Sequence, residues 1–137
     1  MARVLDASVL LHWLADEPLS AQARALLASQ DDLLAPVLAR SEVGNGLWMQ
    51  VRCGRMTIEE ASVRMEALAD SGVRFVDDPA LQVAALHIGA RLEHPAYDWE
   101  YVALAIAEGC DLVTADDALW QRACEIIGER AVWLSDV

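Results

Sequence analysis

The sequence contains no lysine. All ten basic residues are arginine, and 22 acidic residues give the 137-residue chain a formal net charge of −12. Without lysine, and without the glycine pattern of a phosphate-binding loop, a Walker-type nucleotide site is excluded. Receiver domains and haloacid-dehalogenase-like phosphatases, in which Asp6 would be phosphorylated, also use a lysine and are disfavoured. The negative charge disfavours broad electrostatic binding of nucleic acid. It still allows an enzyme that contacts nucleic acid through a local arginine patch and a metal.

Cysteines and long apolar runs are also scarce. The three cysteines, Cys53, Cys110 and Cys124, form no C-x-x-C pair, so neither a disulfide framework nor a thiolate zinc site is indicated. The longest apolar runs, such as 101–107, fall far short of the roughly 18 residues that span a bilayer. No secretory signal pattern is recognisable at the amino terminus. We therefore expect a cytoplasmic protein outside the membrane.

Short apolar segments alternate with amphipathic ones along the whole chain. We expect strands near 3–5, 33–35, 73–76, 110–114 and 131–134. Helices are expected near 9–15, 20–29, 37–52, from 57, 79–92, 98–109 and 118–127. No linker or repeat divides the chain. The sequence predicts a single domain over residues 1–137, an α/β fold with a three-layer α/β/α sandwich around a mainly parallel sheet.

Several residues predict where these helices begin and how they pack. Ser8 is a candidate N-cap for the first helix, and Asp78 for the helix that starts at Pro79. Thr57, with Glu60 three residues later, forms a capping-box pattern. Gly44 and Gly46 lower the helix propensity of 37–52, so we expect another element to approach closely there.

The stretch from Tyr97 to Asp116 predicts a helix that leads into a buried strand, with a carboxylate at each end. Asp98 opens the helix and Asp116 follows the strand. Ligands of parallel sheets bind beyond the carboxyl ends of the strands, where Asp116 would lie. Asp6 follows the first strand and Glu42 lies early in a helix, so all four carboxylates can point toward one edge of the sheet.

Each of these carboxylates also has an ordinary structural explanation, because Asp is a preferred N-cap and Glu suits the first turn of a helix. The four carboxylates together predict more than helix capping. Two like charges about 4 Å apart cost about 4 kcal/mol at an effective dielectric constant of 20, so a cation must compensate. Nearby arginines, Arg3 and Arg40, are too few. Oxygen ligands favour Mg²⁺ or Mn²⁺, and a divalent ion at such a cluster predicts metal-assisted phosphodiester hydrolysis.

Four sequence blocks resemble those of PIN-domain ribonucleases, in particular the VapC-like toxins of bacterial toxin-antitoxin modules. They are VLDASVLL at 4–11, SEVGN at 41–45, YDWEYVALA at 97–105 and LVTAD at 112–116. The blocks follow the family's order and span nearly the whole chain. The resemblance implies a PIN-like fold and selective cleavage of RNA, inhibited by a cognate antitoxin. It also implies a homodimer, because members are commonly dimers.

The resemblance assigns an acidic centre that holds Mg²⁺ or Mn²⁺ and positions the attacking water to Asp6, Glu42, Asp98 and Asp116. It assigns supporting positions to Ser8, Asn45 and Thr114. Asp117 directly follows Asp116, so either residue is a candidate for the fourth ligand while the other starts the helix; the T-x-D match favours Asp116. Whether one ion or two would bind stays open.

Other residues leave alternatives open. His12, His87 and His94 have no metal-ligand spacing, so we expect packing or surface roles. Arg40, Arg52 and Arg55 are candidates for a phosphate-contacting edge, although solvated surface charge is the ordinary reading. Trp13 and Trp48 are candidates to line a hydrophobic groove for an antitoxin helix. The rival to a nuclease is a catalytically silent PIN-like module that binds or regulates a partner.

Overall fold

Five parallel strands form one sheet at the centre of the protein. The computed structural model describes residues 1–93 and 98–137. The strands are β1 (Ala2–Leu5), β2 (Asp32–Pro36), β3 (Arg74–Val76), β4 (Asp111–Thr114) and β5 (Ala131–Trp133). They lie in the order β3-β2-β1-β4-β5. The chain thus moves outward from β1 in one direction and then returns to β4 on its other side, which makes the carboxyl ends of β1 and β4 a topological switch point.

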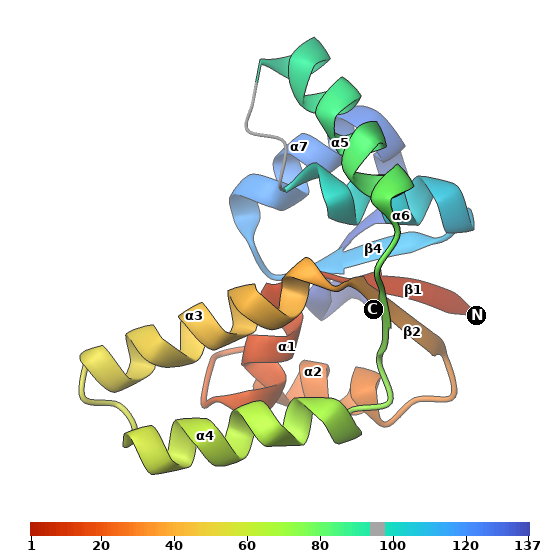
Figure 1. Ribbon diagram of the computed structural model, residues 1–137. Helices are drawn as coiled ribbons and strands as arrows, with labels where there is room; N and C mark the ends of the chain where they lie inside the picture. Colours follow the sequence, from red (N-terminus) through yellow and green to blue (C-terminus); the bar gives the residue numbers. More distant parts are fainter. Residues whose placement is uncertain (94–97) are drawn as a thin grey trace.

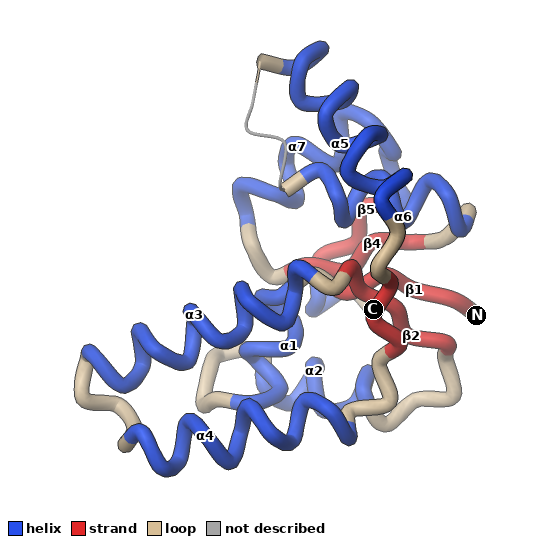
Figure 2. Tube along the Cα trace, viewed as in Figure 1, coloured by secondary structure: helices blue, strands red, loops and turns tan. Residues whose placement is uncertain are grey.

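Helices cover both faces of this sheet, as the sequence predicts. They are α1 (Ala7–Leu14), α2 (Ser20–Leu27), α3 (Leu38–Arg52), α4 (Ile58–Ala67), α5 (Pro79–Leu92), α6 (Trp99–Glu108) and α7 (Asp117–Ile127). Figures 1 and 2 show α1 and α2 on one side of the sheet and α5, α6 and α7 on the other, while α3 and α4 form a hairpin that projects away from it. None of the helices in residues 1–93 and 98–137 has the length and apolar character needed to cross a bilayer.

The core lies between the sheet and its two helical layers. Val4 and Leu5 of β1 and Leu112 and Val113 of β4 have no exposed surface. Such near-continuous apolar strands are typical of parallel sheets that are covered on both faces. Helix α6 packs against β1, β2 and β4, so its first residues reach the carboxyl edge of the central strands.

The caps agree with the sequence at two helices and differ at a third. Thr57 accepts a hydrogen bond from the backbone of Glu60, and Asp78 caps α5 by accepting one from Ala80. The expected N-cap role of Ser8 is wrong: α1 begins at Ala7, and the cap is Asp6, whose side chain accepts from the backbone N–H of Ser8. In D-A-S both side chains are good caps, and the earlier one is used because β1 ends at Leu5.

Close packing at the glycines of α3 occurs at one of the two expected positions. A Cβ at Gly46 would lie 2.4 Å from a methyl carbon of Leu11 on α1, so any larger residue here would require the Leu11 side chain to move. At Gly44 the nearest atom to a Cβ would be Met65 Cε at 3.8 Å, an ordinary contact, so the expectation there is wrong. His94 and Tyr97, which the sequence interpretation also used, lie outside the described residues.

Candidate active site

Asp6 occupies the end of β1 and is buried, with 5% of its surface exposed. One of its oxygens, Oδ2, accepts three hydrogen bonds. Ser8 Oγ donates at 2.6 Å, Thr114 Oγ1 at 2.9 Å and the backbone N–H of Ser8 at 3.4 Å. The carboxylate is therefore held at one oxygen by donors from both central strand ends.

Ser8 and Thr114 also arrange the backbone after β4. The N–H of Ala115 donates to Ser8 Oγ at 2.9 Å, and the N–H of Asp116 donates to Thr114 Oγ1 at 3.0 Å. Each hydroxyl thus donates to Asp6 while it accepts from the loop that carries Asp116. The supporting roles expected for these two residues have a physical basis: they join the ends of β1 and β4 side by side.

Glu42 lies on α3 and is partly exposed. Its Oε1 accepts a hydrogen bond of 2.8 Å from the hydroxyl of Tyr101, a residue of α6 with no exposed surface. The contact spans 59 residues of sequence. This hydrogen bond places the Glu42 carboxylate of the α3–α4 hairpin against α6, the helix that follows Asp98.

Asp98 and Asp116 each stand at the start of a helix, but their side chains behave differently. Asp116 Oδ1 accepts from the backbone N–H groups of Ala118 and Leu119 and caps α7. Asp98 precedes α6 without making a capping hydrogen bond from its side chain. Capping therefore accounts for part of the role of Asp116, and it does not account for Asp98.

Asp117 is the first residue of α7, and its Oδ2 accepts a hydrogen bond from Gln121 one turn later. The adjacent acidic residues thus point to different tasks. Both residues are exposed. The charge of Asp116 acts on the carboxyl group of Asp6, whereas the side chain of Asp117 bonds along its own helix. Asn45, the third expected supporting residue, is exposed on α3 and makes no hydrogen bond to Asp6, Glu42 or Asp116 in the described part of the chain.

The carboxylates influence one another's protonation. Burial raises the pKa of Asp6, hydrogen bonds from Ser8 and Thr114 oppose that rise, and the negative charge of Asp116 adds to it. The structure thus brings charges from the ends of β1 and β4 within electrostatic range of each other.

Glu42 also interacts electrostatically with these carboxylates. Burial raises the pKa of Glu42 to about 7, the Tyr101 hydrogen bond opposes the rise, and the charges of Asp6, Asp98 and Glu100 add to it. All four carboxylates singled out from the sequence are therefore linked by these interactions, Glu42 with Asp6 and Asp98, and Asp6 with Asp116.

Glu100 is a fifth acidic residue at this edge that the sequence interpretation missed. It is buried on α6, and burial raises its pKa while a hydrogen bond with Gln82 opposes the rise. The available signal was a glutamate in the otherwise apolar first turns of a helix, two residues after Asp98. Its partner Gln82 lies on α5, so the contact depends on tertiary packing.

The donor set suits a hard divalent cation. In residues 1–93 and 98–137, the hydrogen bonds to Asp6, Glu42 and Asp116 all go to one oxygen of each carboxylate, and none of the three forms an ion pair. No three His, Cys, Asp or Glu side chains in those ranges lie in an arrangement that could hold a metal ion. The fit to a cation therefore rests on the chemistry of the carboxylate oxygens, which are the ligands that Mg²⁺ and Mn²⁺ prefer.

Comparisons with known proteins identify the family and the fold. The family model for the PIN domain matches residues 3–125. The chain belongs to the PIN domain family. Over 124 residues it is 32% identical to ribonuclease VapC3 of Pyrobaculum aerophilum, a match that covers 89% of this chain and 95% of the relative. The resemblance to VapC-like PIN proteins inferred from the four sequence blocks is confirmed.

The fold comparison is independent of close sequence similarity. The crystal structure of PAE2754 from Pyrobaculum aerophilum superimposes with a TM-score of 0.76 at 24% identity, over 98% of this chain and 85% of that one. At this identity the match shows the fold alone. The expected three-layer arrangement with a parallel sheet is thereby confirmed as a PIN-like fold.

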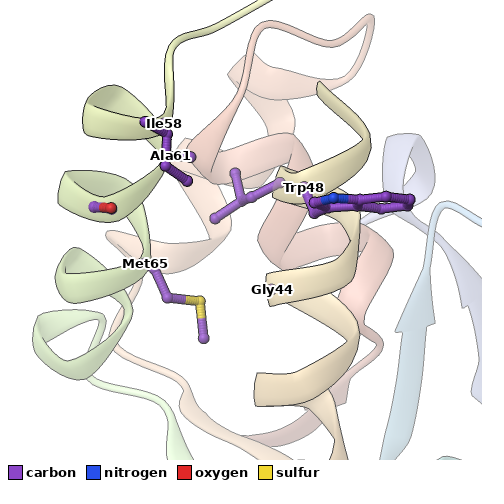
Figure 3. A pocket seen from close by; sticks show the side chains of 7 residues that line it. Gly44, Trp48, Ile58, Ala61 and Met65 are labelled. Atoms are coloured by element: carbon purple, nitrogen blue, oxygen red, sulfur yellow. The ribbon is translucent and has the colours of Figure 1, made fainter. Parts of the chain in front are cut away.

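This PIN domain also has an apolar groove between α3 and α4. It is lined by Gly44, Leu47, Trp48, Ile58, Ala61, Ser62 and Met65. Figure 3 shows Ile58, Ala61 and Met65 on α4 opposite Gly44 and Trp48 on α3. Trp48 is 53% exposed, and Figure 3 shows its ring directed away from α4. Trp13 is not among the lining residues, and it packs partly buried against the core.

The remaining candidate side chains make contacts within the fold. Arg40 lies over the ring of Phe75 at 4.6 Å and Arg52 over that of Trp48 at 5.4 Å. Arg55 pairs at 3.9 Å with a glutamate of the α1–α2 loop. These are structural contacts of surface arginines. A His12 ring nitrogen bonds the backbone of α1, and His87 is exposed.

Proposed function

We propose that this PIN domain is a metal-dependent endoribonuclease and the toxin of a toxin-antitoxin module. The proposal is supported by pairwise electrostatic interactions among the four carboxylates, Glu42 with Asp6 and Asp98, and Asp6 with Asp116. The identity with a protein named as ribonuclease VapC3 supports the choice of RNA as substrate. The proposed reaction is a cytoplasmic one.

The four carboxylates would hold Mg²⁺ or Mn²⁺, which supplies an activated water and polarises the phosphodiester when bound. Ser8 and Thr114 keep Asp6 in place through its Oδ2, and the capping bonds of Asp116 fix its Oδ1. Each residue thus keeps a second oxygen for an ion. The chain's own contribution is to orient these oxygens at one edge and to bury Asp6 away from bulk water.

Cleavage of RNA by the purified, antitoxin-free protein tests this proposal. We expect fragments from a broad transcript pool in Mg²⁺ or Mn²⁺, loss of cleavage with EDTA, and loss with Asp98→Asn. Mapping the ends on total RNA would define the preferred sequence. No cleavage under any of these metal conditions would favour the alternative, a catalytically silent PIN-like module that binds or regulates a partner.

Adjacent acidic residues provide a matched pair for assigning the fourth ligand. Asp116→Asn and Asp117→Asn remove one charge each at neighbouring positions, and asparagine retains the ability to cap α7 at residue 116. We expect Asp116→Asn to raise the Mn²⁺ concentration needed for cleavage and Asp117→Asn to leave it unchanged. The reverse result would move the assignment to Asp117.

The groove between α3 and α4 is the surface we propose for the antitoxin. Its walls are apolar, and Glu59 and Glu60 lie beside it, so it suits an amphipathic helix with basic flanks. We expect Ile58→Ala, which truncates an exposed residue of the groove wall, to weaken inhibition by the cognate antitoxin at least tenfold while RNA cleavage persists. Ile106→Ala, which truncates an exposed apolar residue near the end of α6, serves as the control and should leave inhibition intact.

A homodimer is part of the proposed assembly. Helix α5 supports it, because Val83 and Leu86 are 56% and 61% exposed on a helix whose other side packs against α6. Exposed apolar side chains at helical spacing suit a helix-helix contact. Sedimentation at micromolar concentration measures the state, and a monomer throughout would contradict the expectation.

A further inference from the structure

A hydrogen bond between Tyr101 and Glu42 connects α6 to the carboxylate of the α3–α4 hairpin. The hydroxyl of Tyr101 donates to Glu42 Oε1 at 2.8 Å. Tyr101 is fully buried, whereas Glu42 is partly exposed. The buried aromatic ring fixes where its hydroxyl lies, so the hydrogen bond restricts Glu42 rather than the reverse.

We propose that Tyr101 is a positioning residue for the metal centre, and this inference rests on the proposed function. By engaging Oε1, the tyrosine holds the flexible glutamate side chain in one rotamer and leaves Oε2 to an ion. A hydrogen bond to a metal-binding carboxylate both orients it and reduces the conformational entropy lost when the ion binds. Tyr101 does not itself contact the ion or RNA.

The placement of Tyr101 along α6 strengthens the argument. It lies three residues after Asp98, almost one helical turn, so α6 carries one expected ligand and the residue that holds another. Glu42 stands among the negative charges of Asp6, Asp98 and Glu100. Repulsion from these charges would drive its side chain toward solvent, and the Tyr101 hydrogen bond opposes that movement.

A purely structural role for Tyr101 makes a different prediction. The ring fills core space between α6 and the sheet, a task that phenylalanine performs equally well. A buried hydroxyl needs a hydrogen-bond partner, and Glu42 would then serve the tyrosine. In that case the hydroxyl contributes to stability but leaves the response to metal unchanged.

Tyr101→Phe separates the two roles, because it removes one oxygen and keeps the ring. We expect the Mn²⁺ concentration for half-maximal cleavage to rise about 10- to 100-fold, the usual effect of losing a group that orients a metal ligand. Saturating Mn²⁺ should restore most of the maximal rate. The Mn²⁺-induced rise in melting temperature should shift to higher Mn²⁺ by the same factor, which gives a readout independent of RNA cleavage.

Two further variants sharpen the test. Ser20→Ala also removes a buried hydroxyl, which donates to the backbone of Ala15 at 2.8 Å in the α1–α2 region; it should lower stability without changing the Mn²⁺ response. In a Glu42→Gln background, Tyr101→Phe should shift the Mn²⁺-dependent melting less than twofold, since its effect passes through Glu42. If Tyr101→Phe does not fold, Glu42→Asp moves the carboxylate away from Tyr101 by one methylene and should show the same loss.

The outcomes distinguish this inference from the proposed function. A wild-type protein that cleaves RNA with Mn²⁺, together with a Tyr101→Phe variant of unchanged Mn²⁺ dependence, overturns the positioning role alone. A Tyr101→Phe effect that persists in full in the Glu42→Gln background overturns it too. A wild type that neither cleaves RNA nor is stabilised by Mn²⁺ overturns the proposed function, and the positioning role with it.

Discussion

The hydroxyl of Thr114 lies 2.9 Å from Oδ2 of Asp6 and donates a hydrogen bond to it, which ties the end of β4 to the end of β1. The Thr114 hydroxyl oxygen, Oγ1, in turn accepts a hydrogen bond from the backbone N–H of Asp116 at 3.0 Å. One buried hydroxyl therefore sets the position of two acidic residues that are 110 residues apart in the sequence. Removing this hydroxyl should lower the free energy of unfolding and raise the Mn²⁺ concentration needed for stabilisation.

Thr114→Val keeps the shape of the side chain and removes this hydroxyl. We expect a loss of about 1–3 kcal/mol in the free energy of unfolding, because a buried carboxylate loses a donor and a backbone N–H loses its acceptor. Urea denaturation of the metal-free protein measures this loss. The Mn²⁺ concentration needed for thermal stabilisation should also rise.

Thr57→Ala is the matched control, since Thr57 caps α4 at a distance from the carboxylates. It should cost about 1 kcal/mol, the usual loss for an N-cap, and leave the Mn²⁺ response unchanged. A Thr114→Val variant whose Mn²⁺ response equals that of Thr57→Ala would show that the threonine serves the fold only.

Alanine at the two glycines of α3 should have opposite effects. At Gly44 the new methyl makes only an ordinary contact with Met65, so the gain in helix propensity should stabilise the protein by about 0.5–1 kcal/mol. At Gly46 it would clash with Leu11 at 2.4 Å, and overpacking of this kind costs about 1–3 kcal/mol. Chemical denaturation of both variants checks the signs. Equal effects would mean that the Leu11 side chain moves aside at little cost.

The order of elements and the fold class follow from the sequence because apolar periodicity and turn residues are local signals. The strands around Leu5, Leu34 and Leu112 are short apolar runs, and Pro79 and Thr57 mark helix starts. Boundaries are less certain where two residues compete, as at Asp6 and Ser8. The structure resolves that case in favour of the residue nearer the strand.

The site follows from the sequence only in part. The residues at strand ends and helix starts, such as Asp6 and Asp116, stand where the topology of a parallel sheet makes them converge. Tyr101 and Glu100 could not be assigned, because their partners Glu42 and Gln82 lie on other helices. In the sequence Tyr101 is one more apolar residue of an amphipathic helix, and only tertiary packing reveals its hydroxyl as a donor.

Asp98→Asn should separate metal binding from folding. The negative charge of Asp98 acts unfavourably on Glu42, so we expect the metal-free variant to unfold at the same temperature as wild type or higher. Wild type should be stabilised by Mn²⁺ by about 2.7 kcal/mol at 100 times the dissociation constant, and the variant much less. Thermal melts with and without Mn²⁺ measure both effects. A clear loss of metal-free stability would instead assign Asp98 a structural role.

The pKa of Glu42 predicts how stability depends on pH. Burial and the charges of Asp6, Asp98 and Glu100, opposed by the Tyr101 hydrogen bond, raise it from 4.5 to about 7. Between these values the folded protein binds more protons than the unfolded chain, so the stability of the metal-free protein should fall as the pH rises from 4.5 to 7. The favourable contribution is complete below pH 4.5 and is lost as the pH passes about 7.

Glu42→Gln removes this titration and should flatten the decline. Some slope should persist, because burial also raises the pKa of Asp6 and Glu100. Saturating Mn²⁺ should reverse the trend in wild type, since an ion binds the charged carboxylates and is displaced by protons. Urea denaturation at half-unit pH steps, with EDTA or Mn²⁺, measures all three curves. If wild type and Glu42→Gln lose stability in parallel between pH 4.5 and 7, Glu42 titrates as an ordinary surface carboxylate. The inferred interactions of Glu42 with the charges of Asp6, Asp98 and Glu100 would then be wrong.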